Sequence, residues 1–450
     1  MSPWIGIALT LGALGGLMAG LRAARARTGM HPELCRKLLH IGMGLTTLSF
    51  PWLFHAAWPV VLLAAVSMGL LIGLRRSEAL RERFGGVVDG VERKSLGEVF
   101  FPPAVAAVFV LSRGDPVLYG IPVLLLTLGD AAAALVGVRY GTVRYTTSEG
   151  HKSAEGSVAF FLAAFLSVHV PLLLFTTTGR TESLFIGLTL GLLATLMEAA
   201  AWSGLDNLFL PLGGFVLLRV FVGLNSAELA ARLGVAAGLL LLALAWRRRT
   251  TLNDSAMMGA ALAGYVAWAV GGPKWLVAPA TLLCGYTLLW PLTKGDAEAD
   301  GTRPHGIGEV VDSTGVGMGW LFLAGALGRP DLLFPYTLSF AGHLAIIGGI
   351  RLRSRLPGTV APVMILSAVA KSAVLFILPC LLLEGRGQRP LIAAVAGPAG
   401  IALTVGIAWL SEHLPAASPP AARKWLRQAG IAVGSAAGLI PLTGRGPWSI

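Results

Sequence analysis

Residues 124–135 read LLLTLGDAAAAL and place one acidic residue, Asp130, inside an apolar stretch. The stretch lies within a longer apolar run, 116–137, which is long enough to cross the roughly 30 Å hydrocarbon core of a bilayer. A carboxylate at such depth is unfavourable unless it has a function and a cationic partner. Lys152, in the loop that follows, is the partner that we expect. The stretch therefore predicts a membrane-embedded helix that carries a polar site.

The composition extends this interpretation to the whole chain. Of its 450 residues, 55% are hydrophobic and 13% are charged, and the mean hydropathy is +0.73. These values are typical of integral membrane proteins. We predict an all-α polytopic membrane protein with about sixteen transmembrane helices. The predicted spans are 3–22, 37–54, 57–74, 98–112, 116–137, 156–175, 183–201, 208–223, 229–246, 255–271, 274–292, 310–327, 332–350, 358–382, 389–410 and 427–442. The first is expected to be retained, because it lacks a basic leader and a small-residue cleavage site.

The net charge of +12 could indicate nucleic-acid binding, but the basic residues lie between the apolar runs and form no single stripe. Loops after odd-numbered spans are basic, whereas loops after even-numbered spans carry few basic residues. The exception follows the run 183–201, where Asp206 and Asn207 replace basic residues. The positive-inside rule predicts that the basic loops face the cytoplasm and that both termini face out. We expect a multi-pass protein of the plasma (inner) membrane, with its active-site loops on the cytoplasmic side and no nucleic-acid partner.

The polar clusters that could carry chemistry lie at the predicted cytoplasmic ends of the spans. The first is 35–40, CRKLLH, in which Arg36 and His40 are four residues apart and share a helix face. A basic pair at a membrane boundary is also typical of a topological anchor. His40 favours a functional interpretation, because a titratable imidazole is an unusual anchor. Arg36, Lys37 and His40 are therefore candidate catalytic residues.

A second cluster, 92–103, reads ERKSLGEVFFPP and places Arg93 and Lys94 just before a predicted helix. Backbone N–H groups at a helix N-terminus beside a basic pair can bind a phosphate group. The alternative is a charged cap at the membrane surface. Arg93 and Lys94 are candidate cofactor-binding residues.

The third cluster contains the aspartate of the opening stretch. Phosphoryl or nucleotidyl transfer needs carboxylates that hold Mg²⁺ and cations that neutralise developing charge. Asp130 and Glu155 can supply the carboxylates, and Arg139 and Lys152 the cations. The alternative is an Asp130–Lys152 ion pair without a catalytic role. The cluster lacks the spacing of a Walker A loop.

A fourth cluster places Glu198 inside the run 183–201, with Asp206 and Asn207 in the loop beyond it. A glutamate at this depth is unfavourable without a cation. Asp206 or Asn207 could also act as a helix N-cap, but that role does not account for Glu198. We expect the three residues to form a second wall of the site.

These segments, in this order, resemble the polyprenol kinase family, which includes dolichol kinases, phytol kinases and CTP-dependent diacylglycerol kinases. The resemblance covers about residues 30–225. The stretches that carry it are 36–40 (RKLLH), 93–102 (RKSLGEVFFP), 129–133 (GDAAA) with Gly137 and Tyr140-Gly141, 152–157 (KSAEGS), and Glu198 with 205–207 (LDN).

The resemblance implies transfer of a phosphoryl group from a nucleoside triphosphate, CTP in this family, to a membrane lipid alcohol. It also implies Mg²⁺ as a cofactor. The catalytic residues would be Asp130, Lys152, Arg36, Lys37 and His40, with either His40 or Asp130 as the general base. The cofactor-binding residues would be Arg93, Lys94, Gly129, Gly137, Arg139, Ser153, Gly156 and Asn207. The metal ligands would be Asp130, Glu155, Glu198 and Asp206.

The second half of the chain begins after a polar boundary at 247–254, RRRTTLND. We predict one membrane domain over 1–246 and a second over 250–450. Residues 252–264 and 308–317 resemble the phytyl-phosphate kinase family, which implies a second phosphorylation of the prenol. The alternative is a scaffold of apolar spans. His343 and Lys371 lie inside predicted spans and could line a second site.

Two other functions fit the same residues. A cytidylyltransferase that forms a CDP-lipid would use the same nucleotide and metal groups. A transporter could use Asp130, Glu198 and Lys371 as an ion path, but its charges should lie near the membrane midplane. Charges at the cytoplasmic ends favour the enzyme. The acceptor lipid, the nucleotide preference and the oligomeric state stay open.

Overall fold

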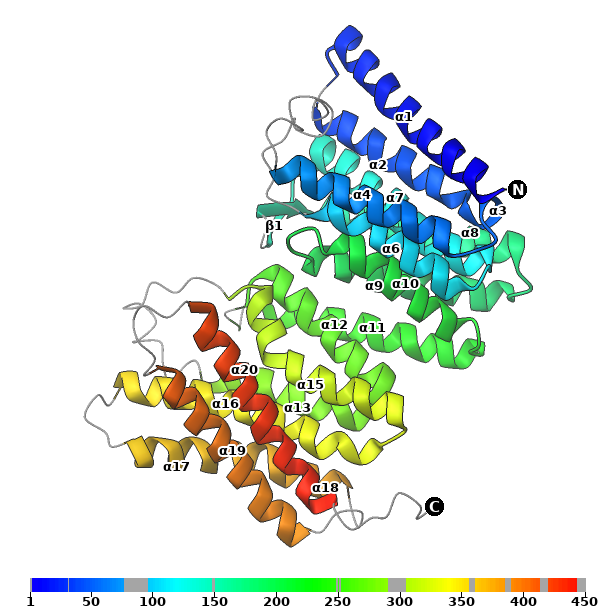
Figure 1. Cartoon of the computed structure of the whole chain (residues 1–450). Helices are drawn as coiled ribbons and strands as arrows, with labels where there is room; N and C mark the ends of the chain where they lie inside the picture. Colours follow the sequence, from blue (N-terminus) through cyan, green and yellow to red (C-terminus); the bar gives the residue numbers. More distant parts are fainter. Residues whose placement is uncertain are drawn as a thin grey trace. The chain divides into compact units, whose positions relative to one another are not determined.

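The computed structural model describes residues 2–30, 32–76, 96–147, 150–247, 250, 252–289, 305–355, 361–384, 390–412 and 420–442. The chain divides into two compact units. Unit 1 comprises 1–245 and 253–262, and unit 2 comprises 246–252 and 263–450. Each unit is a group of packed helices (Figure 1).

The helices of unit 1 are α1 (Pro3–Thr28), α2 (Pro32–Leu48), α3 (Phe50–Leu53), α4 (Trp58–Arg76), α6 (Gly97–Ser112), α7 (Pro116–Tyr140), α8 (Ala154–Phe175), α9 (Arg180–Ala200), α10 (Asp206–Phe221) and α11 (Ser226–Trp246). The first residues of α12 (Asp254–Gly271) also belong to this unit. Within it, α7 packs against α2, α8 and α10, and α9 packs against α8.

The start of α7 follows directly from its sequence. Asp115 is the N-cap, and its Oδ1 accepts hydrogen bonds from the N–H groups of Val117 at 2.8 Å and Leu118 at 2.9 Å. Pro116 then occupies the first helical position, where a missing N–H is harmless. Further along, the buried Tyr119 donates its hydroxyl to the Thr47 carbonyl at 2.8 Å, which joins α7 to α2. A buried tyrosine needs such a partner for its hydroxyl.

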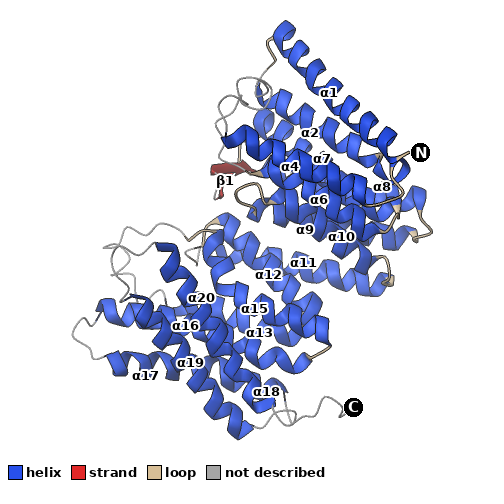
Figure 2. Ribbon diagram, in the orientation of Figure 1, coloured by secondary structure: helices blue, strands red, loops and turns tan. Residues whose placement is uncertain are grey.

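A short β-hairpin departs from the all-α prediction. Strand β1 (Arg144–Thr147) pairs antiparallel with β2 (Gly150–Ser153), and in the described part of the chain they form the only sheet (Figure 2). Tyr145, Thr146 and Thr147 are residues that favour extended backbone. Gly150 has φ +123°, a conformation that side-chain-bearing residues rarely adopt. The hairpin connects the end of α7 to the start of α8.

Among its described residues, unit 2 contains the rest of α12 and eleven further helical segments. They are η3 (Pro273–Leu276), α13 (Val277–Leu289), α15 (Ile307–Leu327), η5 (Pro330–Leu332), α16 (Leu333–Arg355), α17 (Ala361–Ser372), η6 (Ala373–Ile377), α18 (Leu378–Glu384), α19 (Pro390–Glu412), α20 (Pro420–Ala436) and η8 (Ala437–Leu442). The helix α16 packs against α15, α17, α19 and α20, so it forms the centre of the unit.

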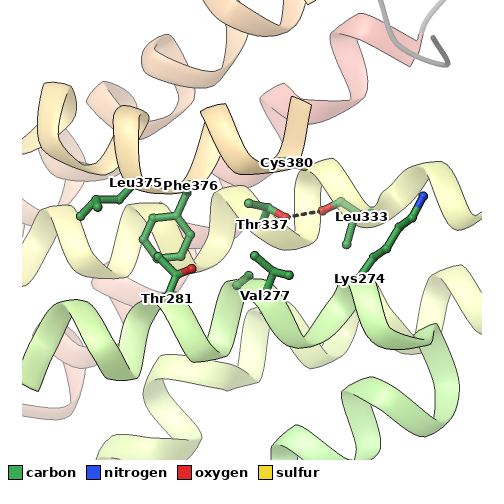
Figure 3. Close-up of a pocket in the computed structure, with 9 residues that line it drawn as sticks. Lys274, Val277, Thr281, Leu333, Thr337, Leu375, Phe376 and Cys380 are labelled. Atoms are coloured by element: carbon green, nitrogen blue, oxygen red, sulfur yellow. Dashed lines mark hydrogen bonds between the residues drawn. The ribbon is translucent and has the colours of Figure 1, made fainter. Parts of the chain in front are cut away.

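The core of unit 2 is aromatic. Tyr336 is fully buried, lies 4.7 Å from Trp275 and 4.9 Å from Phe340 between ring centroids, and donates its hydroxyl to the Trp275 carbonyl at 2.9 Å. A small pocket nearby, between η3–α13, α16 and η6–α18, is lined mainly by apolar groups such as the Phe376 ring, while the Lys274 side chain extends away from that ring (Figure 3).

The helices confirm a membrane protein but not the predicted number of spans. Each predicted run contains helical residues. By length and hydropathy, nine helices within the described residues could cross a membrane. They are Pro3–Thr28, Pro116–Tyr140, Ala154–Phe175, Arg180–Ala200, Ser226–Trp246, Ile307–Leu327, Pro330–Ile350, Ile365–Leu382 and Leu391–Glu412. Helices such as α6 and α10 have 16 residues each, fewer than the roughly 20 that span a bilayer without distortion. The count of about sixteen is not confirmed.

Candidate functional site

Asp130 lies on α7 and is paired with Lys37 of α2. The Lys37 ammonium donates to both carboxylate oxygens, at 2.6 Å to Oδ1 and 2.7 Å to Oδ2. The side chain of Lys37 is 6% exposed and that of Asp130 is 18% exposed. Pairing of this kind is what allows two charges to remain buried. The prediction that Asp130 pairs with Lys152 is therefore wrong, because the lysine that contacts its carboxylate is Lys37 and the Lys152 ammonium donates to Glu198.

His40 and Arg36 complete this side of the site. His40 follows Lys37 by three residues on α2, and its Nε2 lies 3.6 Å from Asp130 Oδ2. Its ring meets Phe101 of α6 edge to face, with centroids 5.6 Å apart. Among the described residues, His40 Nε2 has no hydrogen-bond partner. Arg36 acts electrostatically on both His40 and Asp130. The structure thus brings the first predicted cluster to Asp130.

Lys152 reaches a different carboxylate. It lies on β2 opposite Tyr145 of β1, so the hairpin fixes its backbone. Its ammonium donates to Glu198 Oε1 of α9 at 2.8 Å and also to the Glu198 carbonyl. Lys152 is the cation that the sequence analysis required for Glu198. The two lysines thus hold two different acids.

The surroundings of Lys152 stabilise its charged form. Burial alone would lower the pKa of the ammonium, but the Glu198 carboxylate outweighs burial and Asp206 adds to its effect, so the pKa of Lys152 rises above its usual value. An opposite charge within a few ångströms favours the charged form in this way. Lys152 therefore stays a cation through the neutral and mildly alkaline range.

The two ion pairs belong to one electrostatic cluster. Asp130 and Asp206 both act on Glu198, so the acids of α7, α9 and α10 lie near one another. Asp206 begins α10, and Asn207 donates to Asp206 Oδ1 at 3.3 Å. Gly97 of α6 borders this side of the cluster, because a Cβ at that position would collide with Asn207 Nδ2. The fourth predicted cluster therefore does meet the third.

Glu155 and Ser153 have local partners in the structure. Glu155 Oε1 accepts from the N–H groups of Thr142 and Val143, each at 3.1 Å, and from the Thr142 hydroxyl. Ser153 is the N-cap of α8, and its Oγ accepts from the Gly156 N–H at 3.1 Å. These bonds fix the turn between α7 and the hairpin. The metal and cofactor roles assigned to the two residues stay predictions.

Three predicted glycines lie where α7 and α8 approach most closely. A Cβ at Gly129 would lie 2.8 Å from the Phe160 ring, and one at Gly137 would lie 3.0 Å from Ser153 Oγ. A Cβ at Gly156 would lie 2.9 Å from the Ala133 carbonyl oxygen and 3.3 Å from Gly137 Cα. Here the absence of side chains lets two helices that carry site residues pack together.

Gly156→Ala should destabilise the protein by about 1–3 kcal/mol, as overpacking typically does, because the new methyl group meets backbone that cannot rotate away. The measurement is the thermal unfolding midpoint in detergent. Gly120→Ala on α7 is the matched control, since its Cβ would lie 3.8 Å from Leu48, an ordinary contact. Alanine also favours helix there. Equal midpoints for the two variants would contradict the close-packing role.

Other predicted residues are not assembled with this cluster. Arg139 is exposed at the end of α7, and its guanidinium lies 5.5 Å from the ring centroid of Tyr140. Arg93 and Lys94 lie outside the described residues. In unit 2, Lys371 is exposed on α17. Their predicted roles stay predictions.

The cluster offers few side-chain ligands for a Mg²⁺ ion. Among the residues that the structure describes, no three His, Cys, Asp or Glu side chains are grouped closely enough to hold a metal ion. Mg²⁺ commonly uses one or two carboxylates, with phosphate oxygens and water as its other ligands. Glu198 Oε2 is buried and has no hydrogen-bond partner within the described ranges, so it offers one free acceptor. These residues fit an ion that arrives with a nucleotide.

Sequence reasoning missed several contacts of the hairpin. Asp254, at the start of α12, accepts from the Thr146 N–H at 3.2 Å and lies 3.4 Å from the Thr146 hydroxyl. Tyr145 shares a 2.8 Å hydrogen bond with Ser157 of α8. The run of three β-favouring residues at 145–147 was the available signal. These bonds hold the strand that faces Lys152.

Two known proteins resemble this chain. A phytol kinase from Synechocystis sp. is 29% identical over 216 residues, which are 48% of this chain and 90% of that protein. A probable chloroplastic phytol kinase 2 from Oryza sativa subsp. japonica is 28% identical over 225 residues, which are 47% of this chain and 73% of that protein. No family model matches the chain, and no solved structure gives a significant match. About half of the chain is thus related to the polyprenol and phytol kinase family.

Proposed function

We propose that unit 1 transfers the terminal phosphoryl group of a nucleoside triphosphate to a membrane lipid alcohol such as phytol, dolichol or another prenol. The observation that carries the proposal is the cluster of Lys37–Asp130 and Lys152–Glu198, which brings largely buried cations and acids together from three helices and a hairpin. The relatives, one named a phytol kinase and one a probable phytol kinase, support a lipid-alcohol kinase. CTP as the donor rests on the family resemblance of the sequence.

The chemistry suits these groups. The lipid hydroxyl oxygen would form a bond to the γ-phosphorus, the bond from that phosphorus to the bridging oxygen would break, and the nucleoside diphosphate would leave. The ammonium groups of Lys37 and Lys152 would neutralise the phosphate oxygens as charge develops. His40 Nε2 could accept the hydroxyl proton, with Asp130 Oδ2 3.6 Å away to stabilise the resulting imidazolium. A loose transition state demands little from the base.

Asp130 and Glu198 are the residues that would hold Mg²⁺, and Asp206 is close enough to contribute to the same field. The bound ion would supply charge neutralisation on the phosphate oxygens. The chain's own contribution is to hold acids and lysines in place before the substrate arrives. Substrate phosphates would compete with the acids for the two ammonium groups.

The second half of the chain is proposed to add a second phosphoryl group, which would give the prenyl diphosphate. This proposal rests on the resemblance of 252–264 and 308–317 to the phytyl-phosphate kinase family. The plasma membrane as location, with the site on the cytoplasmic side, rests on the distribution of basic loops.

The test is an assay of the purified protein in detergent with γ-labelled CTP or ATP, Mg²⁺ and a panel of phytol, farnesol, geranylgeraniol, undecaprenol and diacylglycerol. Label in the lipid fraction is the expected result. Label released as pyrophosphate, with cytidine left on the lipid, would replace the kinase with a cytidylyltransferase. No transfer to any acceptor by folded protein would contradict both enzymes.

A further inference from the structure

Unit 2 contains a basic cluster that the proposed reaction of unit 1 does not use. Arg423, Lys424 and Arg427 lie in the first turns of α20, which packs against α15, α16 and α19. Lys424 Nζ lies 2.9 Å from Asp312 Oδ2 of α15, and the Gln428 side chain donates to the Asp312 carbonyl at 2.9 Å. The N-terminal part of α20 is thereby fixed against α15.

Arg427 has donor capacity that its neighbours leave unused. Its Nη2 lies 3.6 Å from Glu412 Oε1 of α19, which is too long for a hydrogen bond. Its Nε is buried and, within the described ranges, has no hydrogen-bond partner. Buried donors in folded proteins nearly always have an acceptor. Among the described residues, the buried Nε–H of Arg427 therefore lacks an acceptor.

His343 supplies a second such atom from the central helix α16. Its Nδ1 is buried and has no hydrogen-bond partner in the described part of the chain. Asp312 and Arg427 are the charged groups that act on it electrostatically. Two buried nitrogen atoms without partners in the described residues therefore come from α16 and α20, two helices that pack against each other.

The charges of the cluster favour an anion. The cluster contains three cations, Arg423, Lys424 and Arg427, and two carboxylates, Asp312 and Glu412. A guanidinium presents a planar fork of N–H groups that matches phosphate oxygens, and lysine adds a point charge. We propose that Arg427, Lys424 and His343 bind a phosphate group carried by a ligand of this protein. A second phosphorylation at this cluster would rest on the proposed function, whereas phosphate binding itself does not.

A purely structural role explains only part of these observations. A polar clamp between α15 and α20 accounts for Lys424, Asp312 and Gln428. Within the described residues it leaves Arg427 Nε without an acceptor and His343 Nδ1 without a hydrogen-bond partner. A phosphate group satisfies all of these features together.

The test measures binding by isothermal titration to the full chain in detergent, with two probes. Farnesyl monophosphate represents a lipid-borne phosphate, and inorganic pyrophosphate represents a soluble one. Arg427→Gln should weaken binding of at least one probe by tenfold or more. Arg329→Gln, which removes an exposed cation at the N-cap of η5 in the same unit, should leave it unchanged. The probe that responds identifies whether the phosphate is lipid-borne or soluble.

A third variant distinguishes phosphate binding by unit 1 from phosphate binding by unit 2. Lys152→Gln should remove only the binding that belongs to unit 1, and the response to Arg427→Gln should persist in that background. If Arg427→Gln does not fold, Arg427→Lys decides, because it keeps the charge and loses the fork. Wild-type affinity for both probes in a folded Arg427 variant, or no binding of either probe by the wild type, would overturn the proposal. Loss of kinase activity plays no part in this readout.

Discussion

Asp130→Asn should lower turnover by about 10³-fold or more, the scale expected when a charged group of a preorganised site is lost. The substitution preserves size but removes the negative charge that holds Lys37 at 2.6–2.7 Å. It also removes the carboxylate that faces His40 Nε2 at 3.6 Å. The measurement is kcat with the preferred lipid alcohol and nucleotide, beside the amount of protein inserted in membranes.

Asp115→Asn is the matched control for this experiment. It makes the same change on the same helix, at an exposed N-cap where asparagine serves as well as aspartate. Its turnover and its thermal midpoint should equal those of the wild type. Near wild-type turnover in Asp130→Asn would contradict the assignment of the Lys37–Asp130 pair to the active site.

Lys152→Gln should have the second largest effect, a loss of turnover on the order of 10²–10³-fold. The substitution removes an ammonium that would contact the phosphates, and it leaves Glu198 buried without its cation. An unpaired buried charge costs about 3–5 kcal/mol, so the thermal midpoint should fall as well. Arg144→Gln, at an exposed position of the same hairpin, should change neither quantity.

A double variant separates catalysis from stability. Lys152→Gln combined with Glu198→Gln leaves no isolated charge, so much of the lost stability should return. Turnover should stay low, because neither the cation nor the acid is restored. Recovery of both quantities would show that the pair is only structural. Thermal midpoints and kcat are measured on the same preparations.

The sequence predicted the helical regions well because hydropathy is a local property. Every apolar run contains helix, and the N-cap of α7 by Asp115 follows from local rules. The number of membrane spans was not confirmed, because a run's apolar length does not fix where its helix begins and ends. The hairpin at 144–153 was missed since a strand of four residues gives little periodicity.

The sequence predicted which residues belong to the candidate site, but not which of them pair with one another. Asp130, Glu198 and Lys152 were selected because charge in an apolar setting requires an explanation. Lys37 lies 93 residues before Asp130, and no local sequence pattern indicates that α2 packs against α7. The nearest lysine along the chain, Lys152, was therefore taken as the partner of the wrong acid. Contacts between distant helices depend on packing that a single sequence does not display.

The helix α12 limits how the two halves of this chain can be exchanged. Its first residues, 254–262, belong to unit 1, where Asp254 accepts from Thr146 of the hairpin. A gene split within codons 246–252 would transfer that acceptor to the second polypeptide, and a split after Leu262 would cut the helix itself. A chimaera that imports the first half from a relative therefore has to import residues 253–262 with it, or the hairpin beneath Lys152 would lose its anchor.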